Sequence, residues 1–477
     1  MQRAEAEAIY DQGREVVVAV LLRMDEQIQR LSERVGQQEE RIAELERRLG
    51  RNSRNSSLPP SQDPPGTPPR RGKDRSGRAQ GGQPGHEGHG RPLLPAWRVD
   101  DVLEHWPQRC RCGHVFCDAD RVAVGEPARH QVEELPVMAT RVTEHRCQRV
   151  RCPGCGARRT GLLPAEVAQS VFGPRLQAAI VTLSVRNRVS RRDIVECCEQ
   201  LFAARISTGS VEAILQRAGD ALEPPYAHLL AAVRRARHVN MDETGWRLRG
   251  ERRFLWGAFS ARHAVLRIMA DRDADRVWEL LGSSSATVTS DRWWAYDSLP
   301  LRRRQVCWAH LKRDFAAHAD GLGAQKELGE HGLRICDELF WAWEIYQHTG
   351  DRHELQRRVL RLRRELKPIL RRYAAKTPRN KRTRGIARNL LKLWPTLWTF
   401  ASVTGVEPTN NHAERALRGA VIYRKLALGS QSPGGERRLE RLLSAHTTCR
   451  LQRRSLHAYL ADLLSADARG DPLPLLA

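Results

Sequence analysis

The sequence lacks any apolar run long enough to cross a membrane. A spanning helix needs about 18 or more apolar residues, and the longest candidate, Val16 to Leu22, is much shorter. A secretory signal is also absent, because Glu5, Glu7 and Asp11 stand where a basic and then an apolar segment would be needed. We therefore expect a protein with no membrane partner and a cytoplasmic location.

Acidic residues are too few to balance the basic ones. The 477 residues include 80 Lys and Arg against 56 Asp and Glu, a formal net charge of +24. Such a surplus favours a polyanionic partner, most often nucleic acid; solvated surface arginine is the alternative. The length predicts two to four domains, and the 40% of hydrophobic residues is enough for folded cores.

An apolar heptad runs through residues 16–49. Its first core position holds Leu21, Ile28, Val35, Ile42 and Leu49, and its second holds Met24, Leu31, Gln38 and Leu45. Four heptads with charges between them predict a coiled coil over residues 1–50 that makes the chain a homo-oligomer. A single amphipathic helix folded on its own protein is the alternative.

Large apolar residues almost disappear in the next segment. Residues 51–105 are dominated by Pro, Gly, Ser and charge, and such a composition cannot bury enough surface to fold by itself. We expect a disordered basic linker, either a solvated tether or a segment that follows DNA phosphates through Arg70, Arg71, Lys73, Arg75 and Arg78.

Most of the chemically interesting cysteines lie between residues 110 and 155. Cys152-Pro-Gly-Cys155-Gly has the spacing of a zinc knuckle, and Cys110 and Cys112 form an upstream pair. Four thiolates would hold one tetrahedral Zn²⁺ and leave no open position for catalysis. The sequence therefore predicts a structural zinc module over residues 106–165. Spare ligands are His114, Cys117 and Cys147, and reduced thiols without metal are the alternative.

Three short helices are expected within residues 166–235. The first runs from Pro174 to about Val185, and the others begin at Ser190 and near Ser207, where capping side chains stand. The arginines between the first two helices indicate a helix-turn-helix-like DNA-binding region: Arg186, Arg188, Arg191 and Arg192. A helical spacer is the alternative.

Residues 236–445 change to the chemistry of strands. Strands are expected at 238–242, 252–259, 264–270, 286–290 and 304–308, with a helix that begins near Asp273. This order predicts an α/β ribonuclease-H-like catalytic domain, a mixed sheet flanked by helices. A basic helical insertion occupies about 312–403 and would suit a DNA clamp. Residues 446–477 form a C-terminal helical tail.

Three carboxylates stand where such a sheet would bring them together. Asp242 is expected at the end of the first strand, before a bend at Gly245, and Asp291 follows the fourth strand. Glu414 lies at the start of a later helix. Carboxylates are the ligands that hold Mg²⁺, and two Mg²⁺ ions can drive phosphodiester cleavage. The three positions therefore form a candidate catalytic metal site.

Each acid also has a simpler interpretation. Glu243 could replace Asp242, or either could be a turn acid. Asp291 could cap the following helix, with Asp297 as a weaker rival. Glu414 fits a capping box in which Asn411 is the cap.

The chain resembles the insertion-sequence-66 family of bacterial transposases over almost its whole length. The resemblance is carried by NSRNSSLPPSQD, GGQPGHEGH, the paired cysteines, MDETGW, TSDRWWAY, CWAHLKRDF and NNHAERALRGAVIYRKLALGSQSPGGER. It implies that Asp242, Asp291 and Glu414 are a DDE triad. Cys307 and His310 look like a Cys-x-x-His signature, which places His310 near the scissile phosphate or in the core.

This sequence departs from the family pattern at two positions. Arg109 stands where the first cysteine of the upstream pair is expected, so Cys110 is displaced by one. Thr409 replaces an Asp that often precedes the Asn-Asn pair of the last helix. The first departure bears on the zinc ligands, and the second removes one charge near the triad.

The resemblance implies a nucleoid-associated enzyme that cleaves DNA at the ends of an element and joins the exposed 3′-OH groups to target DNA. Double-stranded DNA would be the partner, contacted by Arg415, Arg418, Arg424 and Lys425, and accessory proteins of the same element are possible partners. The coiled coil would pair two subunits. The alternatives are an inactive zinc-containing DNA-binding protein and a nuclease without strand transfer.

Overall fold

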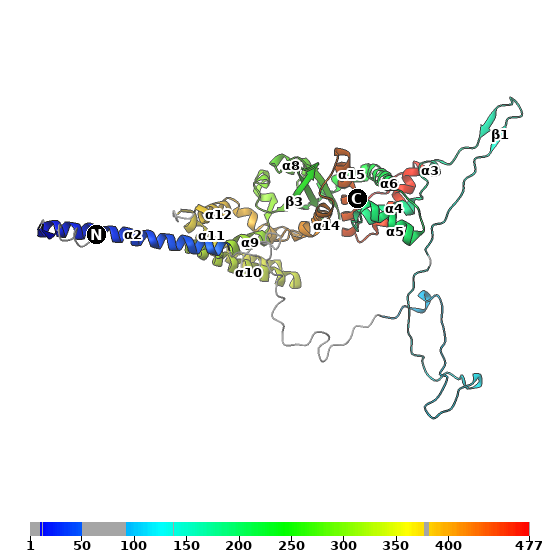
Figure 1. Cartoon of the computed structure of the whole chain (residues 1–477), viewed down its shortest axis with the longest axis horizontal. Coiled ribbons are helices and arrows are strands. Elements are labelled where there is room, and N and C mark those ends of the chain that lie inside the picture. Colours follow the sequence, from blue (N-terminus) through cyan, green and yellow to red (C-terminus); the bar gives the residue numbers. More distant parts are fainter. Residues whose placement is uncertain (1–9, 12, 50–91, 137, 376–380, 477) are drawn as a thin grey trace. The chain divides into compact units, whose positions relative to one another are not determined.

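The computed structural model describes residues 10–11, 13–49, 92–136, 138–375 and 381–476 (Figure 1). The chain forms two compact units, each described by itself. The first comprises Met1–Pro68, Arg146–Ile194 and Ser207–Ala477, and the second Pro69–His145 and Val195–Ile206. No helix within the described ranges is both long and apolar enough to cross a membrane.

A five-stranded mixed sheet is the core of the first unit. Its strands are β3 (His238–Leu248), β4 (Glu251–Phe259), β5 (Ala264–Met269), β6 (Thr287–Ser290) and β7 (Arg304–Val306). They are ordered β5-β4-β3-β6-β7. β3 to β5 pair antiparallel, and β6 and β7 continue the sheet in parallel. Every residue of β6 is buried, as expected of a parallel strand covered on both faces.

The five strands and α8 (Ala274–Leu281), which precedes β6, lie at the predicted places in the chain, except that β3 continues beyond its predicted end. Asp273 is the N-terminal flanking residue of α8, as expected. The α/β architecture with a mixed sheet is therefore present, whereas its ribonuclease-H-like assignment stays a prediction.

The β3–β4 hairpin turns at Arg249 and Gly250, not at Gly245. Both turn residues have positive φ, 50° and 88°, as a tight hairpin turn requires. Gly245 lies within the strand, where a Cβ would be 3.4 Å from the guanidinium of Arg424. The prediction that the strand ends at Asp242 was therefore wrong, because the glycine serves a close approach and the turn lies further on.

The outer edge of β5 is covered by α15 (Pro433–Leu451). Side chains at every fourth helical position accept hydrogen bonds from alternate backbone N–H groups of the strand: Ile268 to Glu440 (2.7 Å), Leu266 to Ser444 (2.8 Å) and Ala264 to Thr448 (3.0 Å). Four helical residues and two strand residues rise by similar distances, about 6–7 Å, so the two periods match. The helix thereby satisfies an edge that could otherwise pair with another chain.

One group of helices precedes β3 along the chain, and another follows β7. The first group is α4 (Pro174–Val185), α5 (Arg191–Phe202), α6 (Thr208–Ala221) and α7 (Glu223–Arg235). Ser190 and Ser207 accept hydrogen bonds from N–H groups three residues on, at 3.2 and 3.1 Å, so the predicted helix starts are confirmed. The helix-turn-helix function stays a prediction.

The last helix is not an isolated tail. α16 (Leu456–Arg469) packs against α4 and α6, and the predicted boundary after residue 445 falls inside α15. The segment is amphipathic, and its apolar face is buried, including Leu460 and Leu463. The C-terminal residues are therefore part of the first unit.

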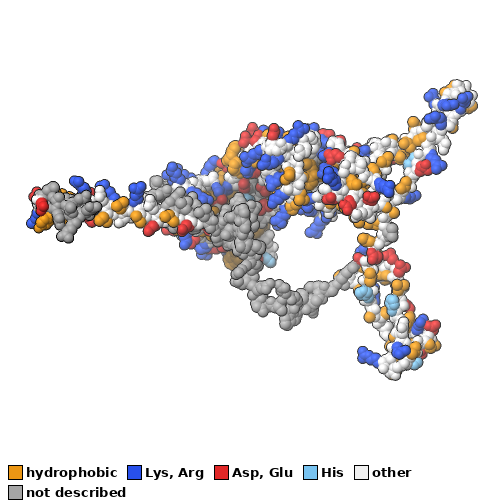
Figure 2. Space-filling view, viewed as in Figure 1, with side chains coloured by type: hydrophobic (Ala, Val, Ile, Leu, Met, Phe, Trp, Pro, Cys, Tyr) orange, Lys and Arg blue, Asp and Glu red, His pale blue; other side chains and the backbone are white. Residues whose placement is uncertain are grey.

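The described residues of the predicted helical insertion are mostly helical. Its helices are α9 (Trp308–Ala319), α10 (Ala324–Thr349), α11 (Arg352–Ala375) and α12 (Lys381–Lys392), followed by the short η6 (Trp394–Leu397) and α13 (Thr399–Ser402). Leu355, Leu362, Leu366 and Leu370 of α11 are buried in a common core, whereas Leu360 is exposed. On the face shown in Figure 2, Lys and Arg side chains are spread over the first unit with Asp and Glu among them.

The N-terminal helix α2 (Arg14–Leu49) is continuous through the predicted heptads. Its described core-position side chains are exposed: Leu21, Met24, Ile28, Leu31, Val35 and Ile42. An uncovered seam of this kind is what self-association requires, although the coiled coil itself stays a prediction. Most of the predicted linker, residues 50–91, lies outside the described residues.

Candidate active site

Asp242 lies on β3 beyond the point where the neighbouring parallel strand ends. β6 pairs with β3 only from His238 to Asn240, while β3 continues along β4. The carboxyl group of Asp242 is largely buried, and its Oδ1 accepts a hydrogen bond from the N–H of Glu243 at 3.0 Å. Asp242 therefore stands at the same edge of the sheet as the residue that follows β6.

Asp291 is that residue. Parallel strands end at a common edge, where ligand sites of such sheets form. Its Oδ1 accepts a hydrogen bond from the N–H of Trp293 at 2.8 Å, just before η4 (Trp294–Ser298). The interpretation as a helix cap thus accounts for one oxygen only. Its Oδ2 makes no hydrogen bond within the part of the chain that the structure describes.

Glu414 lies in the first turn of α14 (Asn411–Ala427). The N-cap of this helix is Asn410, and its side chain makes no capping hydrogen bond. The capping-box interpretation, with Asn411 as the cap, is therefore wrong. The carboxylate of Glu414 instead lies 3.6 Å from Nδ1 of His310 and 3.5 Å from a guanidinium nitrogen of Arg313.

The side chain of Asn410 is directed into the sheet. It is fully buried, donates to the carbonyl oxygen of Met241 at 2.7 Å and accepts from the amide of Asn240 at 2.9 Å. Its backbone N–H donates to Sγ of Cys307 at 3.1 Å. Asn410 thus holds the start of α14 against β3 and the end of β7. Sequence reasoning missed this role because its partners are far away along the chain.

Asp291 and Glu414 both lie within electrostatic reach of Asp242. Burial raises the pKa of Asp242 well above its usual range, and the charges of Glu243, Asp291 and Glu414 raise it further. Nearby negative charges disfavour the ionised form of a buried carboxylate unless a cation offsets them. β3, the end of β6 and the first turn of α14 therefore form one acidic centre.

Glu243, the neighbour and rival of Asp242, is already paired. Arg272 forms an ion pair with one oxygen, and the hydroxyl of Tyr296 donates to the other at 2.6 Å. The guanidinium of Arg272 also lies over the ring of Trp293, 4.1 Å from its centroid. These contacts occupy Glu243 and leave Asp242 as the acid that faces the centre. The sequence contained no motif that joins Glu243 to Arg272 or Tyr296.

Asp297, the rival of Asp291, belongs to a separate group of charges. Its two oxygens pair with the fully buried Arg304 and with Lys392, each at 2.8 Å. Burial by itself would raise the pKa of Asp297, but the hydrogen bonds from Lys392 and Arg304 lower it overall. Asp297 therefore holds a buried cation. Arg304 in turn donates to the backbone carbonyl of Asp291 at 3.0 Å.

Cys307, His310 and Glu414 form the one group of three potential metal ligands found among the described residues, with ligand atoms within 4.8 Å of one another. Nδ1 of His310 is buried and has no hydrogen-bond partner there, which contradicts a hydrogen-bonded core role for this atom. Burial and the charge of Arg313 lower the pKa of His310, so its imidazole is neutral at pH 7. Burial raises the pKa of the Cys307 thiol to about 11.

Comparison with known proteins identifies the family. Residues 169–438, more than half of the chain, match the Transposase IS66 family. The chain belongs to the IS66 transposase family. Residues 2–92 match a family of unknown function (DUF6444). An uncharacterized protein, y4hP, of Sinorhizobium fredii (strain NBRC 101917 / NGR234) is 24% identical over 420 residues, which cover 79% of this chain and 74% of that protein.

The family match confirms the resemblance inferred from the motifs and includes all three candidate acids. Asp242, Asp291, Glu414 and His310 fall within the matched residues, whereas both cysteine pairs precede them. The transposase assignment thus has support in the segment where the acidic centre forms, and the zinc prediction rests on the cysteines alone.

The predicted DNA-contacting residues of this IS66-family chain lie on α14. Arg415, Arg418 and Lys425 are exposed and can meet a phosphate. Arg424 differs, because its guanidinium donates to the hydroxyl of Thr244 at 2.9 Å and to the carbonyl of Gly245. It fastens the helix to β3, so any contact with DNA would add to a structural role.

The four cysteines predicted to bind zinc form two local pairs in different units of the structure. Cys152 and Cys155 lie in the turn between β1 (Arg149–Arg151) and β2 (Arg158–Thr160). N–H groups of the turn lower the pKa of Cys152, and the N–H of His114 lowers that of Cys112. A lowered thiol pKa favours the thiolate that zinc binds. A common site with Cys110 stays a prediction.

Proposed function

We propose that this chain is a DDE transposase of a bacterial insertion sequence. It would cleave DNA at the ends of the element and join the exposed 3′-OH groups to target DNA. The observation that supports this most directly is the acidic centre, in which the charges of Asp291 and Glu414, from two distant segments, both raise the pKa of Asp242. Membership of the IS66 transposase family supports the same conclusion.

The donor set fits Mg²⁺. Asp242, Asp291 and Glu414 offer hard carboxylate oxygens, which Mg²⁺ prefers, and the raised pKa of Asp242 indicates negative charge without enough compensation. When bound, divalent ions relieve charge on the phosphate and activate the attacking oxygen. Cys307 and His310 are softer donors that fit Zn²⁺ better than Mg²⁺, so the three carboxylates are the proposed magnesium ligands.

The surrounding residues prepare this centre. Asn410 sets the first turn of α14 against β3, and Arg304 holds the backbone of Asp291. The ion pair of Glu243 with Arg272 keeps a second acid away from the substrate. The contacts of Asn410 and Arg304 position Glu414 and Asp291 before DNA arrives, which reduces the reorganisation needed for reaction.

His310 supplies a proton acceptor beside the centre. Its neutral, unpartnered Nδ1 lies 3.6 Å from Glu414. We assign the partly exposed imidazole of His310, and not its buried Nδ1, the task of taking a proton from the attacking water or 3′-OH, a role for which a histidine near neutral pH is suited. Arg415, Arg418 and Lys425 would bind backbone phosphates of the same strand.

The decisive experiment compares wild type with Asp242→Asn. The substrate is a duplex that carries the inverted repeats bounding this reading frame, and cleavage is followed with and without Mg²⁺. We expect Asp242→Asn to abolish cleavage while duplex binding is spared. Cleavage retained by this variant would remove the assignment of Asp242.

The same assay separates the two alternatives. An inactive DNA-binding protein would bind the duplex, and wild type would give no metal-dependent cleavage. A nuclease without strand transfer would release 3′ ends but never join them to a second, unlabelled duplex. A joined product from wild type therefore supports a transposase over both.

The N-terminal segments have supporting roles in this proposal. The exposed apolar seam of α2 would pair two subunits, one for each DNA end. The double variant Ile28→Lys with Leu31→Lys places two charges in this seam, and a smaller oligomer in light scattering is the expected result. Zinc bound by the cysteine pairs would be structural, with Zn²⁺ released when Cys152 and Cys155 are replaced by serine.

A further inference from the structure

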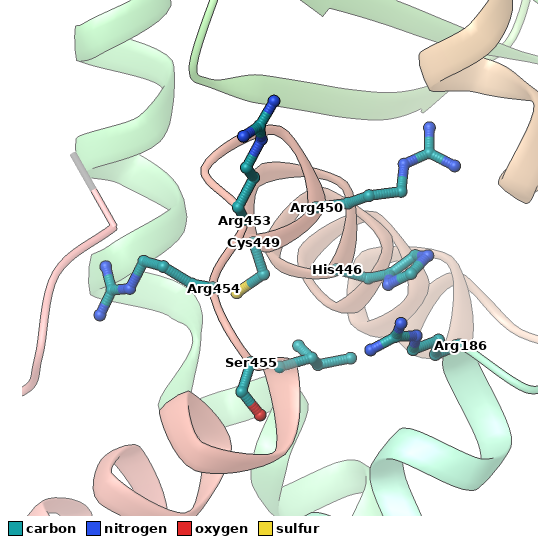
Figure 3. A pocket seen from close by; sticks show the side chains of 8 residues that line it. Arg186, His446, Cys449, Arg450, Arg453, Arg454 and Ser455 are labelled. Atoms are coloured by element: carbon teal, nitrogen blue, oxygen red, sulfur yellow. The ribbon is translucent and has the colours of Figure 1, made fainter. Parts of the chain in front are cut away.

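A basic pocket lies between the end of α4 and the junction of α15 with α16. Its volume is about 270 Å³. Its lining includes Arg186, His446, Arg450, Arg453, Arg454 and Ser455 (Figure 3). No acidic residue lines it. The pocket lies outside the acidic centre, and most of its lining follows the segment that matches the transposase family.

The arginines of this pocket have no counter-charge. None of the four, nor the adjacent Arg188, forms an ion pair with a carboxylate anywhere in the described part of the chain. Burial and the charges of Arg188 and Arg186 lower the pKa of Arg450. Like charges held this close are unfavourable until an anion joins them, so the arrangement is suited to bind one.

His446 adds a buried polar group to the same space. Its side chain is 6% exposed, and its ring makes no hydrogen bond to any residue in the described ranges. Burial and the charges of Arg450, Arg186 and Arg188 lower its pKa to about 4. The ring is therefore neutral at pH 7 and carries one N–H free to donate. Figure 3 shows the ring beside the guanidinium of Arg186.

Two arginines at the turns around the pocket adopt a left-handed backbone. Arg188 has φ 62° and Arg453 has φ 56°, a region that favours glycine. Non-glycine residues held in this conformation cluster at ligand-binding sites, where the side chain has a task that glycine could not perform. The strained backbone positions and the arginines without an ion pair therefore occur around the same pocket.

The pocket is connected to the helix that carries Glu414. Arg450 donates to the backbone carbonyl of Arg415 at 2.7 Å, and Arg188 donates to that of Gly419 at 3.4 Å. These carbonyls lie one and five residues beyond Glu414 on α14, a rise of at most about 7.5 Å along the helix. A DNA strand bound at the acidic centre could therefore pass the exposed side chain of Arg415 and reach the pocket.

We propose that this pocket binds a phosphate group of the DNA backbone. The inference rests on the proposed function for the identity of the polyanion, and it adds a phosphate site that the acid triad does not supply. Guanidinium groups of Arg186 and Arg450 would bind the phosphate oxygens in the planar, two-pronged manner typical of arginine. His446 would donate the neutral hydrogen bond.

The test uses the full chain and the double variant Arg186→Gln with Arg453→Gly. Neither native side chain makes a hydrogen bond or ion pair with a described residue, and glycine relieves the left-handed backbone at Arg453, so the variant is expected to unfold at the wild-type temperature or higher. Arg302→Gln is the control, because Arg302 is exposed at the opposite edge of the sheet, next to β7.

Binding of a fluorescent duplex is measured by anisotropy in EDTA over a range of salt concentrations. Loss of one phosphate contact lowers the slope of log affinity against log salt by about 0.9, and we expect this decrease in the double variant but not in Arg302→Gln. Equal slopes for the double variant and Arg302→Gln would overturn the proposal that the pocket binds a phosphate of the DNA backbone. Because no metal is present, this result is independent of the cleavage test, in which failure of the proposed function would appear.

A second arm asks whether the phosphate belongs to DNA or is free in solution. Inorganic phosphate is titrated while the unfolding temperature is recorded. If phosphate stabilises wild type but not the double variant, and the duplex slopes are unchanged, the pocket binds a free anion and the DNA proposal is overturned. If the duplex slope falls in the double variant and duplex DNA displaces the phosphate, the proposal is supported.

Discussion

The side-chain amide of Asn410 donates a hydrogen bond to the carbonyl oxygen of Met241, 2.7 Å away. Met241 immediately precedes Asp242, and Asn410 lies about one helical turn before Glu414. A single buried side chain therefore connects the backbone of one candidate metal ligand with that of another. This contact, together with the bonds from Arg424 to Thr244 and Gly245, sets the relative position of β3 and α14.

Replacing Asn410 should therefore affect both stability and cleavage. Asn410→Ala leaves the carbonyl of Met241 and the amide of Asn240 without their partner, which costs about 2–3 kcal/mol of unfolding free energy. Urea unfolding measures the cost. Asn411→Ala is the matched control, because Asn411 is exposed, and it should change stability by less than about 0.5 kcal/mol. Similar losses in both variants would contradict the role of Asn410.

Asp242→Asn should make the metal-free protein more stable. Burial and three neighbouring acids raise the pKa of Asp242, so holding its charge at pH 7 is unfavourable. Removing such a strained functional charge commonly stabilises a protein by about 0.5–2 kcal/mol. Thermal unfolding in EDTA measures this. Added Mg²⁺ should stabilise wild type by mass action but have little effect on the variant.

A control for this experiment is Asp462→Asn, because Asp462 is exposed on α16. It should leave both the unfolding temperature and its response to Mg²⁺ unchanged. A fall in stability for Asp242→Asn in EDTA would show that its carboxylate is satisfied by the protein alone, and the case for a metal ligand would be lost.

Asp297→Asn should lower the stability of the protein and keep its response to Mg²⁺, the opposite of what is expected for Asp242→Asn. Its carboxylate pairs with the fully buried Arg304, and a buried charge left without its partner costs about 3–5 kcal/mol. Because both oxygens of Asp297 are paired with Arg304 and Lys392, Mg²⁺ should still stabilise the variant. Equilibrium unfolding with and without Mg²⁺ tests both expectations. A lost Mg²⁺ response at full stability would instead make Asp297 the ligand.

The strands could be predicted because their signals are local. β4 and β5 are apolar, β-branched or aromatic segments bounded by turn residues, and period and composition suffice to find them. The order of Asp242 and Asp291 along a parallel pair of strands then indicates a common edge. The motifs identified the family for the same reason, since they are short and contiguous.

The contacts that decide between rival residues could not be predicted, because they join positions far apart. Glu243 is excluded as the free acid by Arg272, 29 residues away, and by Tyr296, 53 residues away. The bend expected at Gly245 failed for a similar reason. The glycine makes room for Arg424, 179 residues further on. The residues next to Gly245 in the sequence give no indication of this contact.

Glu440, which accepts the N–H of Ile268 at the edge of β5, should contribute to the pH dependence of stability. Burial raises its pKa from 4.5 to about 7. Between these two values the folded protein retains a proton that the unfolded chain releases. Stability is therefore greatest below about pH 4.5, falls as the pH rises to about 7, and is constant above; the total change from this group is about 3 kcal/mol.

Glu440→Gln keeps an oxygen that can accept from Ile268 but cannot ionise. We expect the decline between about pH 4.5 and 7 to be shallower in this variant than in wild type, and the variant to exceed wild type in stability at pH 8. Glu166→Gln is the control, because Glu166 is exposed on α3 (Ala165–Ala168). Unfolding free energies measured by urea titration from pH 4.5 to 8 provide the comparison. A slope equal to that of wild type in Glu440→Gln would contradict the raised pKa of Glu440 and would mean that this residue of α15 is ionised at neutral pH.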